Sequence, residues 1–201
     1  MTAKVENVVT SGVFQLDGGS WDVDNNVWLV GDDREVFVID AAHDAAAIAE
    51  AVGDRTVRAI VCTHGHNDHV NAAPELAERT GAPILLHPAD RVLWDMTHPR
   101  QRPDAELEDG QILTIAGTDL AVLHTPGHAP GAVCLYSTEL GIVFTGDTLF
   151  HGGPGATGRS YSDHPTIVRS IKEKLFALPG DTVVKTGHGE STTIAAEQPN
   201  V

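Results

Sequence analysis

Residues 63–69 of the chain read THGHNDH and place three imidazoles and one carboxylate within a few positions of one another. Such side chains bind metal ions or transfer protons, and a chance grouping among eleven histidines is a poor explanation for them. An apolar run at residues 59–62 precedes the cluster, and a helix-like segment follows it at residues 71–80. The cluster therefore occupies the carboxyl end of a predicted buried strand, where α/β folds place their chemistry.

Three further predicted strands end in the same way, with a glycine turn and one side chain that can bind a metal. Residues 120–124 precede TPGH, residues 142–145 precede GDT, and residues 183–186 precede GHG. Glycine allows a sharp backbone turn, so side chains from several strands can reach one point. Together the four strand ends offer five imidazoles and two carboxylates, namely His64, His66, Asp68, His69, His128, Asp147 and His188.

This donor set predicts a catalytic metal centre. Imidazole with carboxylate suits zinc, iron or manganese, and a set without thiolate argues against a closed structural zinc site. Seven ligands are too many for one tetrahedral ion, but they fit two ions that share a bridge and leave positions open for water. We therefore expect two divalent metal ions that activate water, with zinc favoured and iron or manganese as alternatives.

The elements expected around these strand ends mix strand-rich runs with helices. Asp44 and Asn71 are expected to cap helices, and Gly81 is expected to end one. A plain strand–helix repeat would give one parallel sheet, whereas this mixture predicts two mixed sheets with helices outside, in one domain over residues 1–201. The expected strands are residues 8–15, 27–30, 36–40, 57–63, 83–87, 111–116, 119–124, 132–137, 142–145 and 182–186, and the expected helices are residues 45–52, 71–80, 89–96 and 163–178.

The composition of the chain disfavours some classes of binding partner. The formal net charge of -15 and the pI of about 4.9 disfavour nucleic acid, and no apolar run approaches the roughly 20 residues that span a bilayer. The first residues lack the apolar segment of a secretory signal. Cys62 and Cys134 are expected to be buried free thiols, which fits a reducing cytoplasm, although the sequence leaves a disulfide open. A small-molecule substrate is the expected partner, and the oligomeric state is not indicated.

The order H-x-H-x-D-H, then a lone His, a lone Asp and a lone His, resembles the metallo-β-lactamase superfamily over nearly the whole chain. The resemblance implies an α/β fold, an αββα sandwich of two mixed β-sheets flanked by helices. It also implies how the ligands divide: His64, His66 and His128 for one metal, Asp68, His69 and His188 for the other, and Asp147 as the bridge.

The residue at the bridging position, Asp147, indicates which branch of the superfamily the chain resembles. True β-lactamases of this fold carry Cys or Ser where this chain has Asp147, so antibiotic hydrolysis is not the expected main activity. GDTLF at residues 146–150, Gly158-Arg159 and the GHG turn resemble glyoxalase II and its short bacterial relatives, which implies hydrolysis of acyl thioesters of glutathione. We expect a single domain without the C-terminal helical domain with which full-length glyoxalase II binds glutathione, and residues 151–158 form a longer segment than is usual in those relatives. Glutathione, mycothiol or another thiol therefore stays open.

Roles follow for particular residues. Asp68 and Asp147 are expected to be catalytic by holding the water, and Asp68 can also accept its proton. His151, Arg159 and Tyr161 lie in the glycine-rich segment after Asp147 and are candidate substrate contacts, with Arg159 facing a carboxylate or serving only in a structural ion pair.

The remaining histidines are expected to be structural or solvated. His43 is the exception, because it follows the strand that ends at Asp40 and can approach the site. Two rival functions remain open: a persulfide dioxygenase with one iron held by two His and one Asp, and a lactone hydrolase that shares all seven metal positions.

Overall fold

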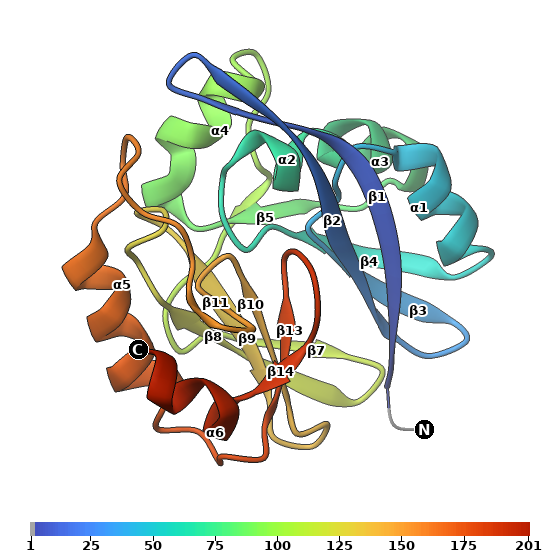
Figure 1. The fold of residues 1–201 in the computed structure, drawn as a ribbon. Coiled ribbons are helices and arrows are strands. Elements are labelled where there is room, and N and C mark those ends of the chain that lie inside the picture. Colours follow the sequence, from blue (N-terminus) through green and yellow to red (C-terminus); the bar gives the residue numbers. More distant parts are fainter. Residues whose placement is uncertain (1–2) are drawn as a thin grey trace.

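The computed structural model describes residues 3–201 and contains two six-stranded mixed sheets, with helices on the outer face of each (Figure 1). The strand order is β1-β2-β3-β4-β5-β6 in one sheet and β14-β13-β10-β9-β8-β7 in the other. This arrangement confirms the predicted αββα sandwich.

The first sheet contains β1 (Lys4–Leu16), β2 (Gly19–Gly31), β3 (Glu35–Ile39), β4 (Thr56–Val61), β5 (Ile84–Leu86) and β6 (Ala105–Glu106). The second contains β7 (Ile112–Ile115), β8 (Thr118–His124), β9 (Val133–Ser137), β10 (Ile142–Gly146), β13 (Val183–Thr186) and β14 (Thr192–Thr193), and a small separate ribbon pairs β11 (Leu149–Phe150) with β12 (Gly153–Pro154). The helices are α1 (Ala45–Val52), α2 (Asn67–Val70), α3 (Ala73–Thr80), α4 (Arg91–Thr97), α5 (His164–Ser170) and α6 (Ile194–Glu197).

Alternation along the strands builds the layers. In β3, Val36 and Val38 pack into an outer core with Ile48 of α1, whereas Phe37 and Ile39 pack into the core between the sheets. All four are buried, because strands covered on both faces bury both sets of side chains. A third core lies between the second sheet and α5 and includes Ile167.

The sequence predicts helix ends correctly where a neighbouring side chain or a glycine fixes them. Asp44 accepts hydrogen bonds from the N–H groups of the first turn of α1, and Gly81 ends α3 with φ 71°, as expected. The predicted Asn71 cap is wrong, because residues 71–80 do not form one helix: α2 ends at Val70 and α3 begins at Ala73. The helix expected to run to residue 178 keeps α-helical geometry only to Ser170, and continues as a π-helical segment at Ile171–Leu175.

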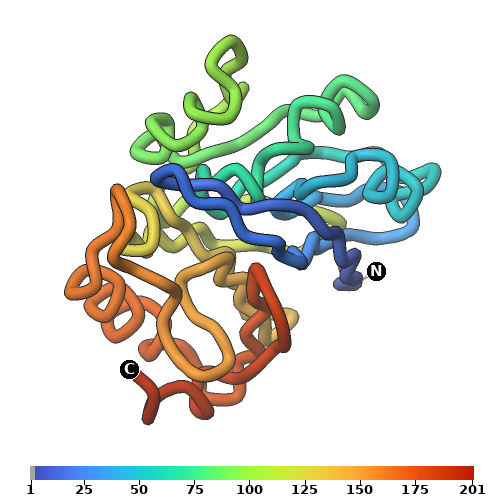
Figure 2. Tube along the Cα trace, turned by 45° about the horizontal axis from the view of Figure 1, so that its top comes forward, coloured from blue at the N-terminus to red at the C-terminus, as the bar shows by residue number. Residues whose placement is uncertain are grey.

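The β1–β2 hairpin is longer than the expected strands. Each strand has 13 residues, and Leu16 pairs with Gly19 across a turn in which Asp17 and Gly18 both have positive φ. Two such residues make a tight turn whose twist suits a long antiparallel ribbon. Figure 2 shows the tip of this hairpin reaching across the molecule to the loop that precedes α5.

Among the described helices, none is long and apolar enough to cross a bilayer.

Candidate metal centre

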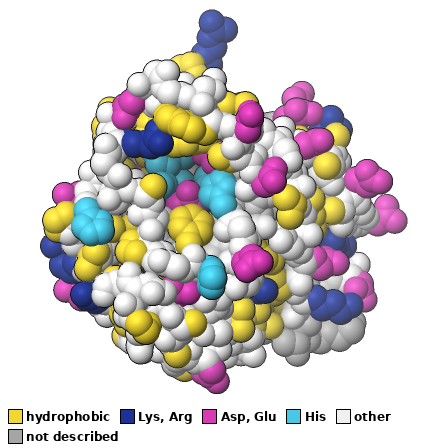
Figure 3. All heavy atoms as spheres, in the orientation of Figure 1, with side chains coloured by type: hydrophobic (Ala, Val, Ile, Leu, Met, Phe, Trp, Pro, Cys, Tyr) yellow, Lys and Arg dark blue, Asp and Glu magenta, His cyan; other side chains and the backbone are white. Residues whose placement is uncertain are grey.

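The structure brings the seven predicted ligands together at the ends of strands from both sheets. His64, His66, Asp68 and His69 lie between β4 and the end of α2, and the other three follow β8, β10 and β13. His64, His66, Asp68, His69 and His128 are all buried. In Figure 3, histidine and acidic side chains gather in a hollow that hydrophobic and basic side chains border.

Three imidazoles form one ligand group. His64, His66 and His128 each offer a nitrogen, and these nitrogens lie within 4.8 Å of one another. His66 Nδ1 is 3.0 Å from His128 Nε2. His128 Nδ1 lies 2.8 Å from the carbonyl oxygen of Ala156 and can only donate to it, so in the neutral ring the Nε2 lone pair faces His66.

A second group combines two imidazoles with a carboxylate. Asp68, His69 and His188 also have their ligand atoms within 4.8 Å of one another. Asp68 Oδ2 lies 3.5 Å from His69 Nε2 and 3.3 Å from His188 Nε2. Asp147 joins the groups, because its carboxylate oxygens lie 3.3 Å from His69, 3.4 Å from His188 and 3.5 Å from His128.

These residues fit divalent metal ions. Within residues 3–201, the buried side-chain nitrogen and oxygen atoms without a hydrogen-bond partner are His64 Nε2, His66 Nε2, Asp68 Oδ1 and Asp147 Oδ1, and all four belong to the predicted ligands. Buried polar atoms left unpaired cost about 1–3 kcal/mol each, so this concentration indicates a ligand of positive charge. Imidazole and carboxylate are donors that zinc, iron and manganese accept.

Outer hydrogen bonds orient the rings. His69 Nδ1 lies 3.0 Å from Asp40 Oδ2, and His188 Nδ1 lies 2.7 Å from the carbonyl oxygen of Asp24. Such partners fix the tautomer and turn the other nitrogen toward the metal. Asp40 also accepts from the N–H and Oγ1 of Thr63, each at 2.7 Å, so its oxygens are occupied and its role is to position His69.

Buried Asp90 ties two ligand-bearing loops together. Its Oδ2 accepts the Gly65 N–H at 2.7 Å, and its Oδ1 accepts the Gly131 N–H. Burial raises the pKa of Asp90 to about 6, although both N–H donors oppose the rise. Sequence reasoning missed Asp40 and Asp90. The apolar run that ends at Asp40 was a usable signal for the first, whereas nothing in the local sequence marks the second.

The two ligand groups differ in proton affinity. Burial lowers the pKa of His66 to about 3 and that of His64 well below its usual value. Burial also opposes charge on His69 and His188, but the Asp147 and Asp68 carboxylates outweigh it: the pKa of His69 rises well above its usual value and that of His188 rises to about 10.

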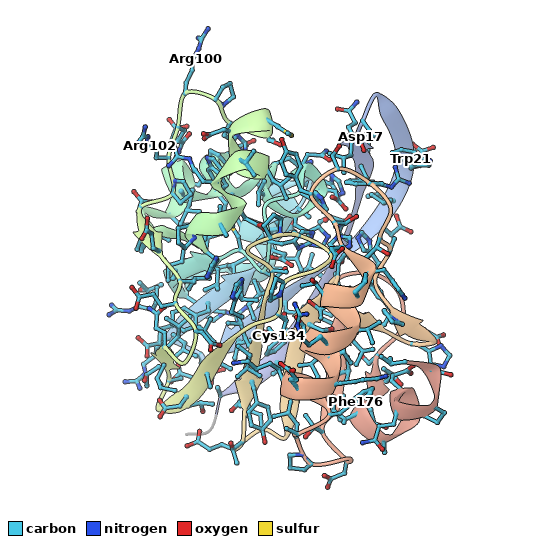
Figure 4. The ribbon with its side chains drawn as sticks, turned by 90° about the vertical axis from the view of Figure 1, so that its left-hand side faces the viewer. Asp17, Trp21, Arg100, Arg102, Cys134 and Phe176 are labelled. Atoms are coloured by element: carbon cyan, nitrogen blue, oxygen red, sulfur yellow. The ribbon has the colours of Figure 1, made fainter. Side chains whose placement is uncertain are left out.

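A cavity of about 230 Å³ opens above the ligands. Its walls come from the β1–β2 hairpin and the loop before α5, and the residues involved include Phe14, Leu16, Trp21, Val23, Ala156, Arg159, Ser160 and Ser162. Figure 4 shows Asp17 and Trp21 at the tip of this hairpin. Asp17 accepts the Ser160 N–H at 2.9 Å, which holds the tip against the loop.

Of the candidate substrate contacts, only Arg159 lines this cavity. Its guanidinium lies 3.7 Å from the centre of the Trp21 ring and 5.5 Å from that of Phe14, and within residues 3–201 it has no ion-pair partner. His151 lines a shallower depression beside His188, and Tyr161 is exposed and lines neither. Cys62 and Cys134 are buried free thiols outside the site, as expected.

The chain belongs to the metallo-β-lactamase superfamily, because the family model for that superfamily matches residues 21–188. The protein from Haemophilus influenzae called hydroxyacylglutathione hydrolase GloC is 34% identical over 190 residues, which cover 86% of this chain and 89% of that protein. A Bacillus subtilis protein called probable metallo-hydrolase YqgX is 32% identical over 188 residues, which cover 87% and 89%.

Solved structures show the same architecture. BLEG-1, described as a B3 metallo-beta-lactamase, superposes with a TM-score of 0.80 at 29% identity and covers 94% of this chain and 97% of its own. TTHA1623 in a di-iron-bound form superposes with a TM-score of 0.78 at 32% identity and covers 89% and 94%.

Proposed function

We propose that this chain is a binuclear metal-dependent hydrolase that cleaves an acyl thioester of a low-molecular-weight thiol. One observation carries the proposal: ligands of both groups, with Asp147 between them, line a cavity whose other residues are mostly apolar and include one arginine. The similarity to the hydroxyacylglutathione hydrolase of Haemophilus influenzae supports the same substrate class.

Each residue has a defined task in this proposal. His64, His66 and His128 hold one ion, Asp68, His69 and His188 hold the other, and Asp147 reaches both. Divalent ions bound there supply Lewis acidity that acidifies water and polarises a carbonyl oxygen. Asp68 orients the attacking water through its carboxylate and accepts the proton of that water.

The cavity lining favours a thiolate as the leaving group. Apart from the ligands and Arg159, the cavity residues are apolar or serine, so no lysine, tyrosine or cysteine stands ready to protonate a departing amine. A thiol with a pKa of about 8.5 departs as an anion without such help, whereas an unstrained amide needs it. The apolar walls formed by Phe14, Leu16 and Val23 suit the carbon chain of an acyl thioester.

Arg159 gives the cavity a point of charge recognition. Stacking on Trp21 holds the guanidinium at the cavity wall, and within residues 3–201 it forms no ion pair with a carboxylate. On a chain with a net charge of -15, such an arginine suits a substrate carboxylate. Glutathione and other small thiols with carboxylates meet this requirement.

The decisive experiment measures metal content by mass spectrometry and assays S-lactoylglutathione on the same sample. About two metal ions per chain with thioester cleavage are expected.

Asp68→Ala should abolish turnover while the protein stays folded. Arg159→Gln should raise KM by about 10- to 150-fold with little change in kcat, because a charge-assisted contact is worth about 1.5–3 kcal/mol. Arg169→Gln, an exposed arginine of α5, is the matched control.

Parallel assays separate the rivals. One iron per chain with oxygen uptake on glutathione persulfide would identify a dioxygenase and refute the hydrolase. Cleavage of a lactone or of a β-lactam without thioester cleavage would keep the metal centre but refute the thioester substrate.

A further inference from the structure

Three residues outside the ligand set form a chain of hydrogen bonds that leads away from Asp68: Asn25, which is buried, and His43 and Asn71, which are partly buried. Asn25 of β2 is fully buried, and its Nδ2 lies 3.2 Å from Asp68 Oδ2 and 3.3 Å from His69 Nε2. Its Oδ1 lies 2.8 Å from His43 Nε2. On the other side of that ring, Nδ1 lies 3.0 Å from Nδ2 of Asn71.

The direction of this chain of hydrogen bonds is fixed. Asn71 Oδ1 accepts the backbone N–H of His43 at 2.6 Å, so the other end of the amide, Nδ2, must be the donor to His43 Nδ1. A ring that accepts at Nδ1 carries its proton on Nε2 and donates it to Asn25 Oδ1. Asn25 therefore presents an N–H, and not an oxygen, to Asp68.

The backbone is shaped to hold the ring of His43 in place. His43 has φ 59°, a left-handed conformation that costs a non-glycine residue some strain. Its ring packs against Gly12 of β1, where an added Cβ would overlap the ring atoms. Strain and a close approach at one residue indicate that the position of the ring serves a purpose.

We infer that Asn71, His43 and Asn25 form a positioning relay that sets the metal affinity of the Asp68–His69–His188 group. The donor from Asn25 holds Oδ2 of Asp68, the oxygen nearest to both imidazoles of that group, and leaves Oδ1 unpaired. His43 fixes which end of the Asn25 amide faces inward. The His64–His66–His128 group has no contact with these three residues among the described hydrogen bonds.

The test is a zinc titration of the full chain against a chromophoric chelator, which resolves two equivalents. Asn25 is the direct partner of Asp68, and losing such a partner usually costs about 10–100-fold in metal affinity. His43→Ala acts through Asn25, so it should weaken one equivalent by up to that factor and leave the other unchanged. His43→Gln should restore it, because its side-chain amide offers an N–H at the place of Nε2. His87→Ala, a partly buried histidine stacked on His124, is the matched control and should change neither equivalent.

Other results would overturn the relay. Unchanged affinity for both equivalents in His43→Ala would do so, as would equal weakening of both, and so would a His43→Gln variant that behaves like His43→Ala. Thermal unfolding of the zinc-free variants checks the fold, and Asn25→Ala interrupts the relay from its other end if His43→Ala does not fold.

The relay rests on the proposed function only for its effect on catalysis, and its effect on zinc affinity does not depend on which reaction the protein catalyses. Zinc binding is measured without substrate, so loss of one equivalent in a protein that cleaves no thioester would refute the function and keep the relay. Thioester cleavage with zinc binding insensitive to His43 would do the reverse.

Discussion

The two ligand groups should load with metal by different proton chemistry. A metal ion needs a neutral imidazole, so a protonated histidine must lose its proton before it can bind. Low pKa values keep His64 and His66 neutral at pH 7, whereas His69 and His188 hold protons there in the protein stripped of metal. Binding at the Asp68–His69–His188 group must therefore displace protons.

The size of this effect follows from the pKa values. His188 has a pKa of about 10, which lies about three pH units above neutrality, so its proton lowers the metal affinity at pH 7 roughly thousandfold. The sign is fixed: a raised pKa makes binding stronger as the pH rises toward that pKa. The logarithm of this affinity should increase by about one per pH unit for His188, and by about one more for His69.

Calorimetric zinc titrations in buffers of different ionisation enthalpy count the protons released. Zinc binding to the His64–His66–His128 group should depend little on pH near neutrality, because His64 and His66 are already neutral there. Zinc binding to the Asp68–His69–His188 group should release one to two more protons. A water molecule acidified by the ions adds a proton of its own, so the variant His188→Asn is the control. It should release about one proton fewer than the wild type. Equal pH slopes for the two equivalents would refute the reasoning.

Three further changes test the shell around the ligands. Asp90→Asn should remove a pH-dependent contribution to the free energy of unfolding. Folding raises the Asp90 pKa to about 6 from about 3.9, so the unfolded state loses this proton first as the pH rises. The free energy of unfolding of the wild type should therefore fall by up to about 3 kcal/mol, relative to the variant, between these two pKa values. Chemical denaturation across this range measures it, with exposed Asp95→Asn as the control. Gly187→Ala should cost metal binding, because the new Cβ would overlap Asp147 Oδ1, and metal analysis of a folded variant with full occupancy would contradict this. Trp21→Ala should raise KM, because Arg159 loses the ring on which it stacks, and it should change the melting temperature little. A lower melting temperature together with the higher KM would indicate a structural role for Trp21 instead.

The sequence predicts well what depends on short-range signals. Apolar runs followed by glycine turns located the four ligand-bearing strand ends, and the Asp44 and Gly81 signals located helix ends, because each arises within a few residues. The mixture of strand-rich runs and helices was enough to predict two mixed sheets.

Features that depend on distant partners could not be predicted in this way. Residues 19–24 are mostly polar and were not expected to be strand, yet they belong to β2, and the tip of the hairpin contacts the loop at Ser160, 143 residues from Asp17. Asn71 looked like a helix cap, but its side chain is used by His43. Asn25 carried a usable signal, since an asparagine beside a buried apolar strand run is uncommon.

Hydrogen bonds from the first sheet also hold the turn of the second sheet that carries His188. Asn26 of β2 donates its N–H to Gly187 at 2.8 Å, and Trp28 donates to the carbonyl oxygen of Thr186 at 3.0 Å, so β2 holds the turn that carries His188. The ligands of the Asp68–His69–His188 group come from segments that follow strands of both sheets, so a metal ion bound to them would connect the two sheets. Metal binding at this group should then raise the stability of the packing between the sheets, since a ligand that binds only the folded state stabilises it in proportion to its affinity.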